Sequence, residues 1–296
     1  MPKTRLNAWL SCVMVLACVA TLGCRPHTLS LDLPGWVLVW HDEFGGAAGS
    51  PPDATKWGHD VGGGGWGNFE RQYYTGSTAN AAVDGRGALV ITATTAPANS
   101  LSCWYGNCTH TSARLLTKGK YDFTYGRVEA RIQIPYGQGI WPAFWMLGND
   151  IDTVGWPACG EIDVMENIGR EPTTVHGTFH GPGYSGANGI GGIYTQTAPF
   201  SETYHVYAVE WESGAVRWTV DGSLYLTRTV ADLPAGATWV LDHPFFIILN
   251  VAVGGMWPGD ADGSTIFPQT MKVDYVRVYR PARQTWLPLA RGEVIP

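Results

Sequence analysis

Apolar residues in this chain alternate with polar ones over short runs, and no long segment repeats them every three or four positions as an amphipathic helix would. Turn residues separate the runs, and the 296 residues include 38 Gly and 19 Pro. Alternation predicts strands, because successive side chains of a strand point to opposite faces. The sequence therefore predicts an all-β protein, a β-sandwich of the jelly-roll type, with few and short helices.

Ten runs are predicted to be strands. They span residues 36–40, 88–93, 126–134, 143–147, 162–165, 174–179, 205–211, 216–220, 245–251 and 272–279. Residues 200–201 and 230–233 are expected to form helical turns. No internal repeat is present, so one folded domain over residues 35–282 is expected.

The first 24 residues are typical of an export signal. Lys3 and Arg5 precede an apolar run that is short for a membrane span. The tetrapeptide ending at Cys24 resembles a bacterial lipoprotein cleavage box, which would make Cys24 a lipid anchor that tethers the protein without crossing the membrane. We expect residues 25–34 to be a linker, residues 283–296 to be a C-terminal tail, and the protein to be extracellular or at the cell surface.

The chain has six cysteines, of which Cys24 belongs to the cleavage box. Cys12 and Cys18 belong to the signal. Cys103 and Cys108 can close a small disulfide loop in an oxidising compartment, the alternative being two free thiols. Cys159 then has no partner and is expected to be a buried small residue.

Charge and aromatic content indicate the kind of partner. Charged residues make up only 15% of the chain and the formal net charge is −6, which disfavours nucleic acid as a partner. The chain contains 14 Trp and 13 Tyr. Aromatic rings can stack on the apolar face of a sugar, although at least half of these rings are expected simply to fill the core.

Three carboxylates lie close together in the segment 160–167. On a strand, Glu161 and Asp163 share one face, but Glu166 lies five positions after Glu161 and points away. Glu166 joins the other two only if one residue is bulged out, near Val164 or Met165. Carboxylates facing a common cleft can hydrolyse a glycosidic bond. A solvated strand face or a carboxylate metal site would be the alternative.

Other segments also fit a sugar cleft. The Gly-rich run 62–68 lets the backbone come close to a ligand, although a flexible surface loop would look the same. Trp141 and Trp145 lie four apart, hence on one strand face, where they line either subsites or the core. His176 and His180 have the same spacing. Because the H-E-x-x-H zinc pattern is absent, His180 is expected to contact sugar, not metal.

Together these segments resemble the bacterial laminarinases, the endo-β-1,3-glucanases of glycoside hydrolase family 16. The resemblance runs from about residue 36 to residue 279. It rests on the acidic segment, on 64–74, on 141–146, on 176–181 and on 274–279.

The resemblance implies a jelly roll with an open groove across its concave sheet, and hydrolysis with retention of configuration. It implies Glu161 as the nucleophile, Glu166 as the acid/base and Asp163 as the residue that orients Glu161. Since two close carboxyls repel when both are ionised, Glu166 is expected to carry the proton in the free enzyme. The extra residue before Glu166 matches the laminarinase form, not the lichenase-like E-x-D-x-E form.

The resemblance also implies binding residues. The sugar contacts would be Asn68, Arg114, Trp141, Trp145, His180 and Trp257. No cofactor is expected for catalysis, but a structural calcium is implied at Glu43, Gly87 and Asp274, partly through backbone oxygens. The implied partner is a β-1,3-glucan bound by a monomer. The alternatives are a mixed-linkage β-1,3/1,4-glucanase, a β-glucan transglycosylase or, less favoured, a non-catalytic glucan-binding protein.

Overall fold

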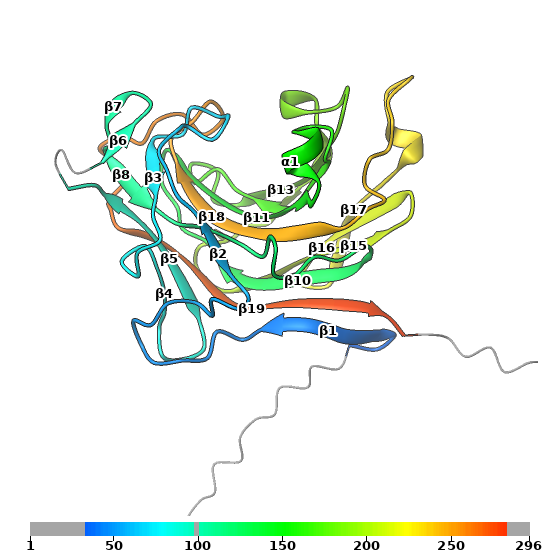
Figure 1. Cartoon of the computed structure of the whole chain (residues 1–296), viewed down its shortest axis with the longest axis horizontal. Coiled ribbons are helices and arrows are strands. Elements are labelled where there is room, and N and C mark those ends of the chain that lie inside the picture. The colour runs from blue at the N-terminus through cyan, green and yellow to red at the C-terminus, as the bar shows by residue number, and fades with distance from the viewer. Residues whose placement is uncertain (1–32, 98–100, 283–296) are drawn as a thin grey trace, which may run out of the picture. The chain divides into compact units, whose positions relative to one another are not determined.

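The computed structural model describes residues 33–97 and 101–282, which form two packed β-sheets (Figure 1). The export signal with Cys12, Cys18 and Cys24, the linker up to residue 32 and the tail 283–296 lie outside the described residues. Their assignments therefore stay predictions. Within the described part of the chain, no helix is long and apolar enough to cross a membrane.

The first sheet has ten strands in the order β17-β16-β15-β10-β19-β5-β8-β3, with β1 paired to β19 and β4 paired to β5. Its strands are β1 (Trp36–Asp42), β3 (Gln72–Tyr74), β4 (Ala81–Val83), β5 (Leu89–Thr95), β8 (His110–Ser112), β10 (Gly126–Gln133), β15 (His205–Glu212), β16 (Ala215–Val220), β17 (Ser223–Thr229) and β19 (Gln269–Pro281).

The second sheet has seven strands in the order β14-β13-β12-β11-β18-β9-β2. They are β2 (Gly58–Asp60), β9 (Arg114–Leu116), β11 (Ile140–Gly148), β12 (Glu161–Glu166), β13 (Thr174–His180), β14 (Ile190–Thr195) and β18 (Phe245–Val253). A separate hairpin joins β6 (Ser102–Cys103) to β7 (Gly106–Asn107), and the helical turns are α1 (Ile151–Val154), η1 (Gly186–Asn188) and η2 (Val230–Asp232).

The core lies between the two sheets and explains the alternation in the sequence. Every second residue of β5 is buried, as alternation predicts, and β18 is buried along its whole length because it is central in its sheet. Leu89, Val128, Phe144 and Ile247 are fully enclosed in this core. The predicted all-β jelly-roll sandwich is thus confirmed.

All ten predicted strands are present, as is the helical turn at residues 230–232. The expected helical turn at 200–201 is wrong, since these residues form a simple turn. The strands that the sequence missed are mostly two or three residues long, or are edge strands with few buried residues, like β14 and β17. The disulfide between Cys103 and Cys108 is confirmed, and Cys159 is buried with a free thiol.

Candidate active site

Strand β12 contains the bulge that the carboxylate spacing requires. On the neighbouring β11, Phe144 pairs with Met165 and the next residue, Trp145, pairs with Asp163, so Val164 is the extra residue. The register against β13 shifts over the same interval. The predicted bulge near Val164 or Met165 is therefore confirmed.

A core residue stabilises this bulge by a hydrogen bond. Trp218 of β16 donates its indole N–H to the carbonyl of Asp163 at 2.8 Å, which gives that backbone group a partner within the core. Trp218 can reach this position because residue 177 is glycine. A Cβ on Gly177 would lie 2.4 Å from the Trp218 ring.

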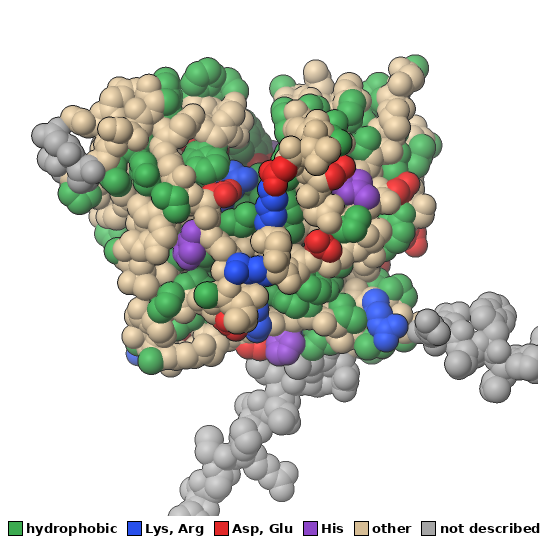
Figure 2. Space-filling model, in the orientation of Figure 1, with side chains coloured by type: hydrophobic (Ala, Val, Ile, Leu, Met, Phe, Trp, Pro, Cys, Tyr) green, Lys and Arg blue, Asp and Glu red, His purple; other side chains and the backbone are tan. Residues whose placement is uncertain are grey.

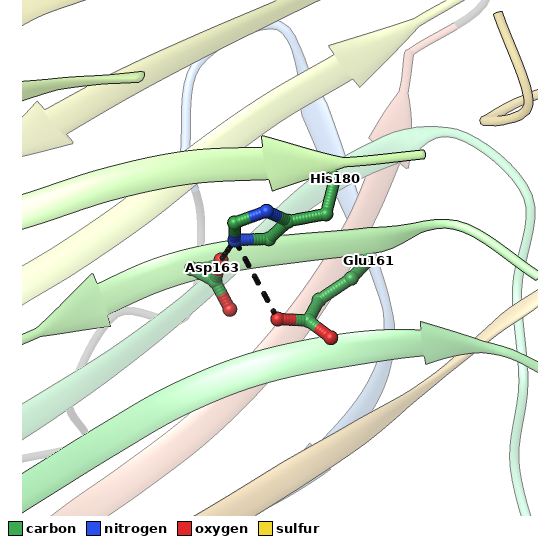
Figure 3. A group of neighbouring side chains, drawn as sticks. All are labelled: Glu161, Asp163 and His180. Carbon is green, nitrogen blue, oxygen red and sulfur yellow. Dashed lines mark ion pairs between the residues drawn. The ribbon is translucent and has the colours of Figure 1, made fainter. Parts of the chain in front are cut away.

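Two of the three carboxylates meet His180 at the centre of the sheet (Figure 3). The Nε2 atom of His180 lies 3.0 Å from Oδ2 of Asp163 and 3.7 Å from Oε1 of Glu161. Glu161 and Asp163 also share a side-chain hydrogen bond. Glu166 accepts a hydrogen bond of 3.0 Å from the indole of Trp141.

The seven-stranded sheet that carries the carboxylates lies beneath a hollow (Figure 1, Figure 2). Figure 2 shows this hollow as a notch between two walls. In the same orientation, the β6–β7 hairpin and β3 stand on one side of it and α1 on the other (Figure 1). The arrangement matches the groove expected across the concave sheet.

The remaining predicted sugar contacts extend from the carboxylates across this sheet. Arg114 of β9 stacks over Trp145 at 4.7 Å and pairs with Asp60 at 3.0 Å, while Trp145 donates its N–H to the buried Asn250. Trp257 packs edge-to-face on Trp141 at 5.5 Å. Four of the six predicted contacts thus lie on β9, β11 and β13, whereas Asn68 and Trp257 lie in the loops before β3 and after β18.

Asn68 belongs to the loop before β3, where its amide donates to Glu70 at 3.4 Å. Glu70 is buried and anchors a hydrogen-bonded chain. It accepts from Gln72 at 2.6 Å and Tyr74 at 3.1 Å, and Tyr74 accepts from Asn250. The sequence analysis missed this chain, which joins Asn68 to the residues beneath Trp145.

Trp156 is the second functional residue that the sequence analysis missed. Its indole donates a hydrogen bond of 2.8 Å to Oε2 of Glu161, from the loop between α1 and β12. The ring is 49% exposed and tilts against His180. A Trp only five positions before Glu161 was the available signal.

The comparisons with known proteins agree with this geometry. The description "Glycosyl hydrolases family 16" matches residues 69–277, which is most of the chain. The chain belongs to glycosyl hydrolase family 16.

Relatives of the enzyme include a β-glucanase from Rhodothermus marinus, 46% identical over 261 residues that cover 83% of this chain and 86% of the relative. The catalytic domain of an endo-1,3-β-glucanase (laminarinase) from Thermotoga petrophila is 48% identical with a TM-score of 0.77, and covers 83% of this chain and 98% of that one. A non-specific endo-β-1,3(4)-glucanase of the family is 37% identical with a TM-score of 0.74. The match covers 84% of this chain and 93% of that one.

Burial raises the pKa of each of the three carboxyl groups at the site of this glycoside hydrolase. Burial raises the pKa of Glu166 well above its usual range, and the charges of Asp163 and Glu161 raise it further. Burial and Asp163 also raise the pKa of Glu161, but His180 and the N–H of Trp156 oppose that rise. The geometry therefore favours Glu166 as the proton carrier and Glu161 as the carboxylate.

Loss of the Asp163 charge is expected to stabilise the fold at high pH. Burial raises the pKa of Asp163 to about 7, against roughly 3.9 for Asp in an unfolded chain. Between these values the fold binds a proton that the unfolded chain lacks, so stability falls as pH rises through this window. Asp163→Asn should raise the melting temperature at pH 8 by roughly 5–10 °C and change it little at pH 3.5.

Calorimetric melting curves at the two pH values measure this effect. The matched control is Asp152→Asn, since the side chain of Asp152 is largely exposed. An Asp163→Asn gain that is the same at both pH values would contradict the protonation argument.

Trp156→Phe, which keeps an aromatic ring but removes the indole N–H, is expected to lower kcat/KM about tenfold. Without the indole N–H, the ionised form of Glu161 loses a donor, so its pKa rises. The acid limb of the pH profile of kcat/KM should therefore move to higher pH. A loss of activity with an unmoved acid limb would mean that Trp156 acts only by packing.

Two groups of residues bear on metal binding. Glu161, Asp163 and His180 form the one cluster of potential ligands found within the described residues. These residues are also two of the predicted catalytic carboxylates and a predicted sugar contact, so the cluster does not by itself indicate a metal site at β12.

The residues implied for calcium lie with the other sheet. Glu43 follows β1, and its carboxylate pairs with Arg277 through two contacts of 2.8 Å. Asp274 on β19 pairs with Arg131 at 2.7 Å. Gly87 packs near the Glu43 carbonyl, 3.7 Å from the position of a Cβ. Both carboxylates already face guanidinium groups, so an ion at these positions would depend mainly on backbone oxygens.

Proposed function

We propose that the enzyme hydrolyses internal β-1,3-glucosidic linkages of laminarin-type β-glucans with retention of configuration. The observation that carries the proposal is the bulge at Val164, which lets Glu166 join Glu161 and Asp163 on one face of β12. The similarity to laminarinases from Thermotoga petrophila and other bacteria supports the choice of linkage.

In the first step, the Glu161 carboxylate attacks the anomeric carbon while Glu166 gives its proton to the departing glycosidic oxygen. The bond between that carbon and that oxygen breaks, and a glycosyl ester forms on Glu161. In the second step, Glu166, now ionised, takes a proton from water, whose oxygen attacks the same carbon and releases Glu161. Asp163 and Trp156 hold Glu161 in place by hydrogen bonds.

A polysaccharide panel with time-resolved product sizing tests this proposal. We expect laminarin chain length to fall rapidly, with a series of oligosaccharides released early, and NMR to show the β-anomer first. Release of monosaccharide alone would exclude endo-action. First formation of the α-anomer would exclude retention.

Mixed-linkage activity is the second candidate, since the non-specific endo-β-1,3(4)-glucanase shares the fold and 37% of the sequence. Comparable rates on lichenan and laminarin would favour it. Products longer than the starting oligosaccharide would favour a transglycosylase. A non-catalytic glucan-binding role is disfavoured because all three acidic residues are present.

We also propose that the protein is exported, lipidated at Cys24 and monomeric. The pattern of residues 1–24 supports export and the lipid anchor. Mass spectrometry of the mature N-terminus distinguishes a lipidated Cys24 from simple cleavage, and light scattering measures the mass of the particle.

A structural calcium at Glu43, Gly87 and Asp274 is the last part of the proposal. The close approach of Gly87 to the Glu43 backbone carbonyl supports the site. The carboxylates of Glu43 and Asp274 are less available to an ion, because each is paired with an Arg. If the ion binds there, adding calcium to EDTA-treated protein should raise the melting temperature and leave the pH profile of activity unchanged. An unchanged melting temperature at millimolar calcium would exclude the site.

A further inference from the structure

The rim of the groove beside Asn68 carries two exposed aromatic side chains. Phe69 is 55% exposed and Trp104 is 44% exposed, and their rings meet edge-to-face with centroids 5.3 Å apart. Phe69 comes from the loop before β3, and Trp104 from the tip of the β6–β7 hairpin. Burying two large aromatic rings would stabilise the fold, so a pair of rings left exposed on the surface indicates a binding role.

The hairpin is fastened to the loop that carries Asn68. The disulfide between Cys103 and Cys108 closes it. The Trp104 backbone N–H donates to the Gly63 carbonyl at 2.9 Å, and its indole N–H donates to the Glu70 carbonyl at 2.8 Å. The attachment therefore uses polar groups and leaves the Trp104 ring partly open.

Glycine makes this close approach possible. Gly65 has a φ of +81°, and a Cβ there would lie 2.9 Å from the Trp104 ring. A larger residue would push the hairpin away from the loop. The Gly-rich run 62–68 thus provides the space into which the Trp104 ring packs.

Phe69 is turned outward by an unusual backbone conformation. Its φ is +58°, in the left-handed region that bulky residues seldom adopt. The preceding Asn68 is half-buried and the following Glu70 is buried, so only Phe69 of the three is presented to solvent. Such conformations persist where a function depends on the direction of the side chain.

A third set of contacts ties the hairpin to the neighbouring loop that follows β18. Arg71 lies over the rings of Trp104 and Tyr105 at 5.0 and 5.1 Å. The same guanidinium binds Asp260 through two hydrogen bonds of 2.8 and 2.9 Å. Asp260 belongs to the loop that also carries Trp257, so the rim is joined to the rest of the groove.

The path from the carboxylates to this rim is continuous. Glu161 lies on β12, and the next strands across the sheet are β11, β18 and β9, spaced about 4.8 Å apart. Arg114 on β9 stacks over Trp66 at 5.1 Å, and Trp66 lies in the same loop as Phe69. A glucan chain that crosses the sheet over these strands therefore meets Phe69 and Trp104 beyond Asn68.

We propose that Phe69 and Trp104 form an additional subsite that binds a distal glucosyl unit of the β-glucan through the apolar face of its ring, with the disulfide-closed hairpin holding the two side chains in place. The proposal rests on the proposed function, because the occupant is a further unit of the same substrate. A neutral carbohydrate fits this rim because aromatic faces and backbone polar groups surround it, and the nearby charge of Arg71 is already paired with Asp260.

The test measures oligosaccharide binding by calorimetry in a Glu161→Gln host, which binds without turnover. In this host, Phe69→Ala and Trp104→Ala should each weaken laminarihexaose binding roughly three- to tenfold and leave laminaritriose binding unchanged. The matched control is Tyr136→Ala. Tyr136 is also an exposed aromatic, but it lines a separate surface hollow that contains none of the predicted site residues.

Loss of the Trp104 ring also removes a hydrogen bond to the Asn68 loop, so Phe69→Ala is the decisive variant. Equal weakening for both oligosaccharides in Phe69→Ala would mean that the rim only supports the loop, and unchanged binding of both would mean that there is no subsite. Either result overturns the proposal. A host that binds neither oligosaccharide would refute the proposed substrate and this subsite together.

Reduction of the disulfide gives an independent readout on the wild-type enzyme. Dithiothreitol should raise KM for laminarin and leave kcat/KM for a short aryl β-glucoside of laminaribiose unchanged. The buried Cys159 thiol is already free and does not contribute to this change. An unchanged KM after verified reduction would contradict the part of the proposal that concerns the hairpin.

Discussion

Glu161→Gly is expected to abolish laminarin hydrolysis, with turnover lowered on the order of 10⁴-fold or more. The reason is that no other carboxylate can replace the nucleophile. Asp163 is only 2% exposed and faces His180, and Glu166 is raised in pKa and held by Trp141. Initial rates of reducing-sugar release over a long time course measure the loss.

Chemical rescue separates loss of the nucleophile from loss of the fold. Glycine at position 161 leaves room for azide, so an activated aryl glycoside should give an α-glycosyl azide at a rate that rises with azide concentration. Glu212→Gly is the matched control, because Glu212 is an exposed carboxylate on the other sheet. Near wild-type turnover in Glu161→Gly would exclude Glu161 as the nucleophile.

The bulge on β12 could be predicted because it follows from the odd number of positions between Glu161 and Glu166. A strand places residues on alternating faces, so an odd spacing between Glu161 and Glu166 is compatible with a common cleft only if one residue is extra. The position of the extra residue depends on Trp218 and Gly177, which lie far away in the sequence. The sequence alone therefore placed the bulge only to within two residues.

The residues that support the site were harder to predict. The chain from Glu70 through Tyr74 to Asn250 joins segments 176 residues apart, and no local pattern marks a hydrogen bond of that kind. Trp156 was missed for a different reason. It lies on an irregular loop, where side-chain direction does not follow from periodicity.

The long strands were predictable and the short ones were not, for a related reason. Strands such as β18 and β19 bury enough apolar side chains to produce a clear pattern. The strands β6 and β7 have two residues each and are held by the disulfide and by contacts with the Asn68 loop. The spacing of the cysteines indicated the disulfide loop, but only the folded chain brings Trp104 next to Phe69.

Glu166→Ala should lower the rate on laminarin roughly 10³- to 10⁴-fold but reduce the rate of glycosyl-enzyme formation from a dinitrophenyl glycoside far less. A glucosyl leaving group needs the proton that Glu166 supplies, whereas dinitrophenolate leaves without it. Burial and the charges of Asp163 and Glu161 raise the pKa of Glu166, so the wild-type enzyme should lose activity at high pH as this proton dissociates.

The pH profile therefore provides the second measurement. In Glu166→Ala the basic limb of the profile on the dinitrophenyl substrate should disappear, while the acid limb that reports Glu161 remains. Trp141→Phe is the comparison variant, since it removes the hydrogen bond to Glu166 while keeping an aromatic ring, and it should move the basic limb to higher pH without abolishing it. Equal losses on both substrates, or a basic limb that survives in Glu166→Ala, would assign the proton to another group of the buried trio.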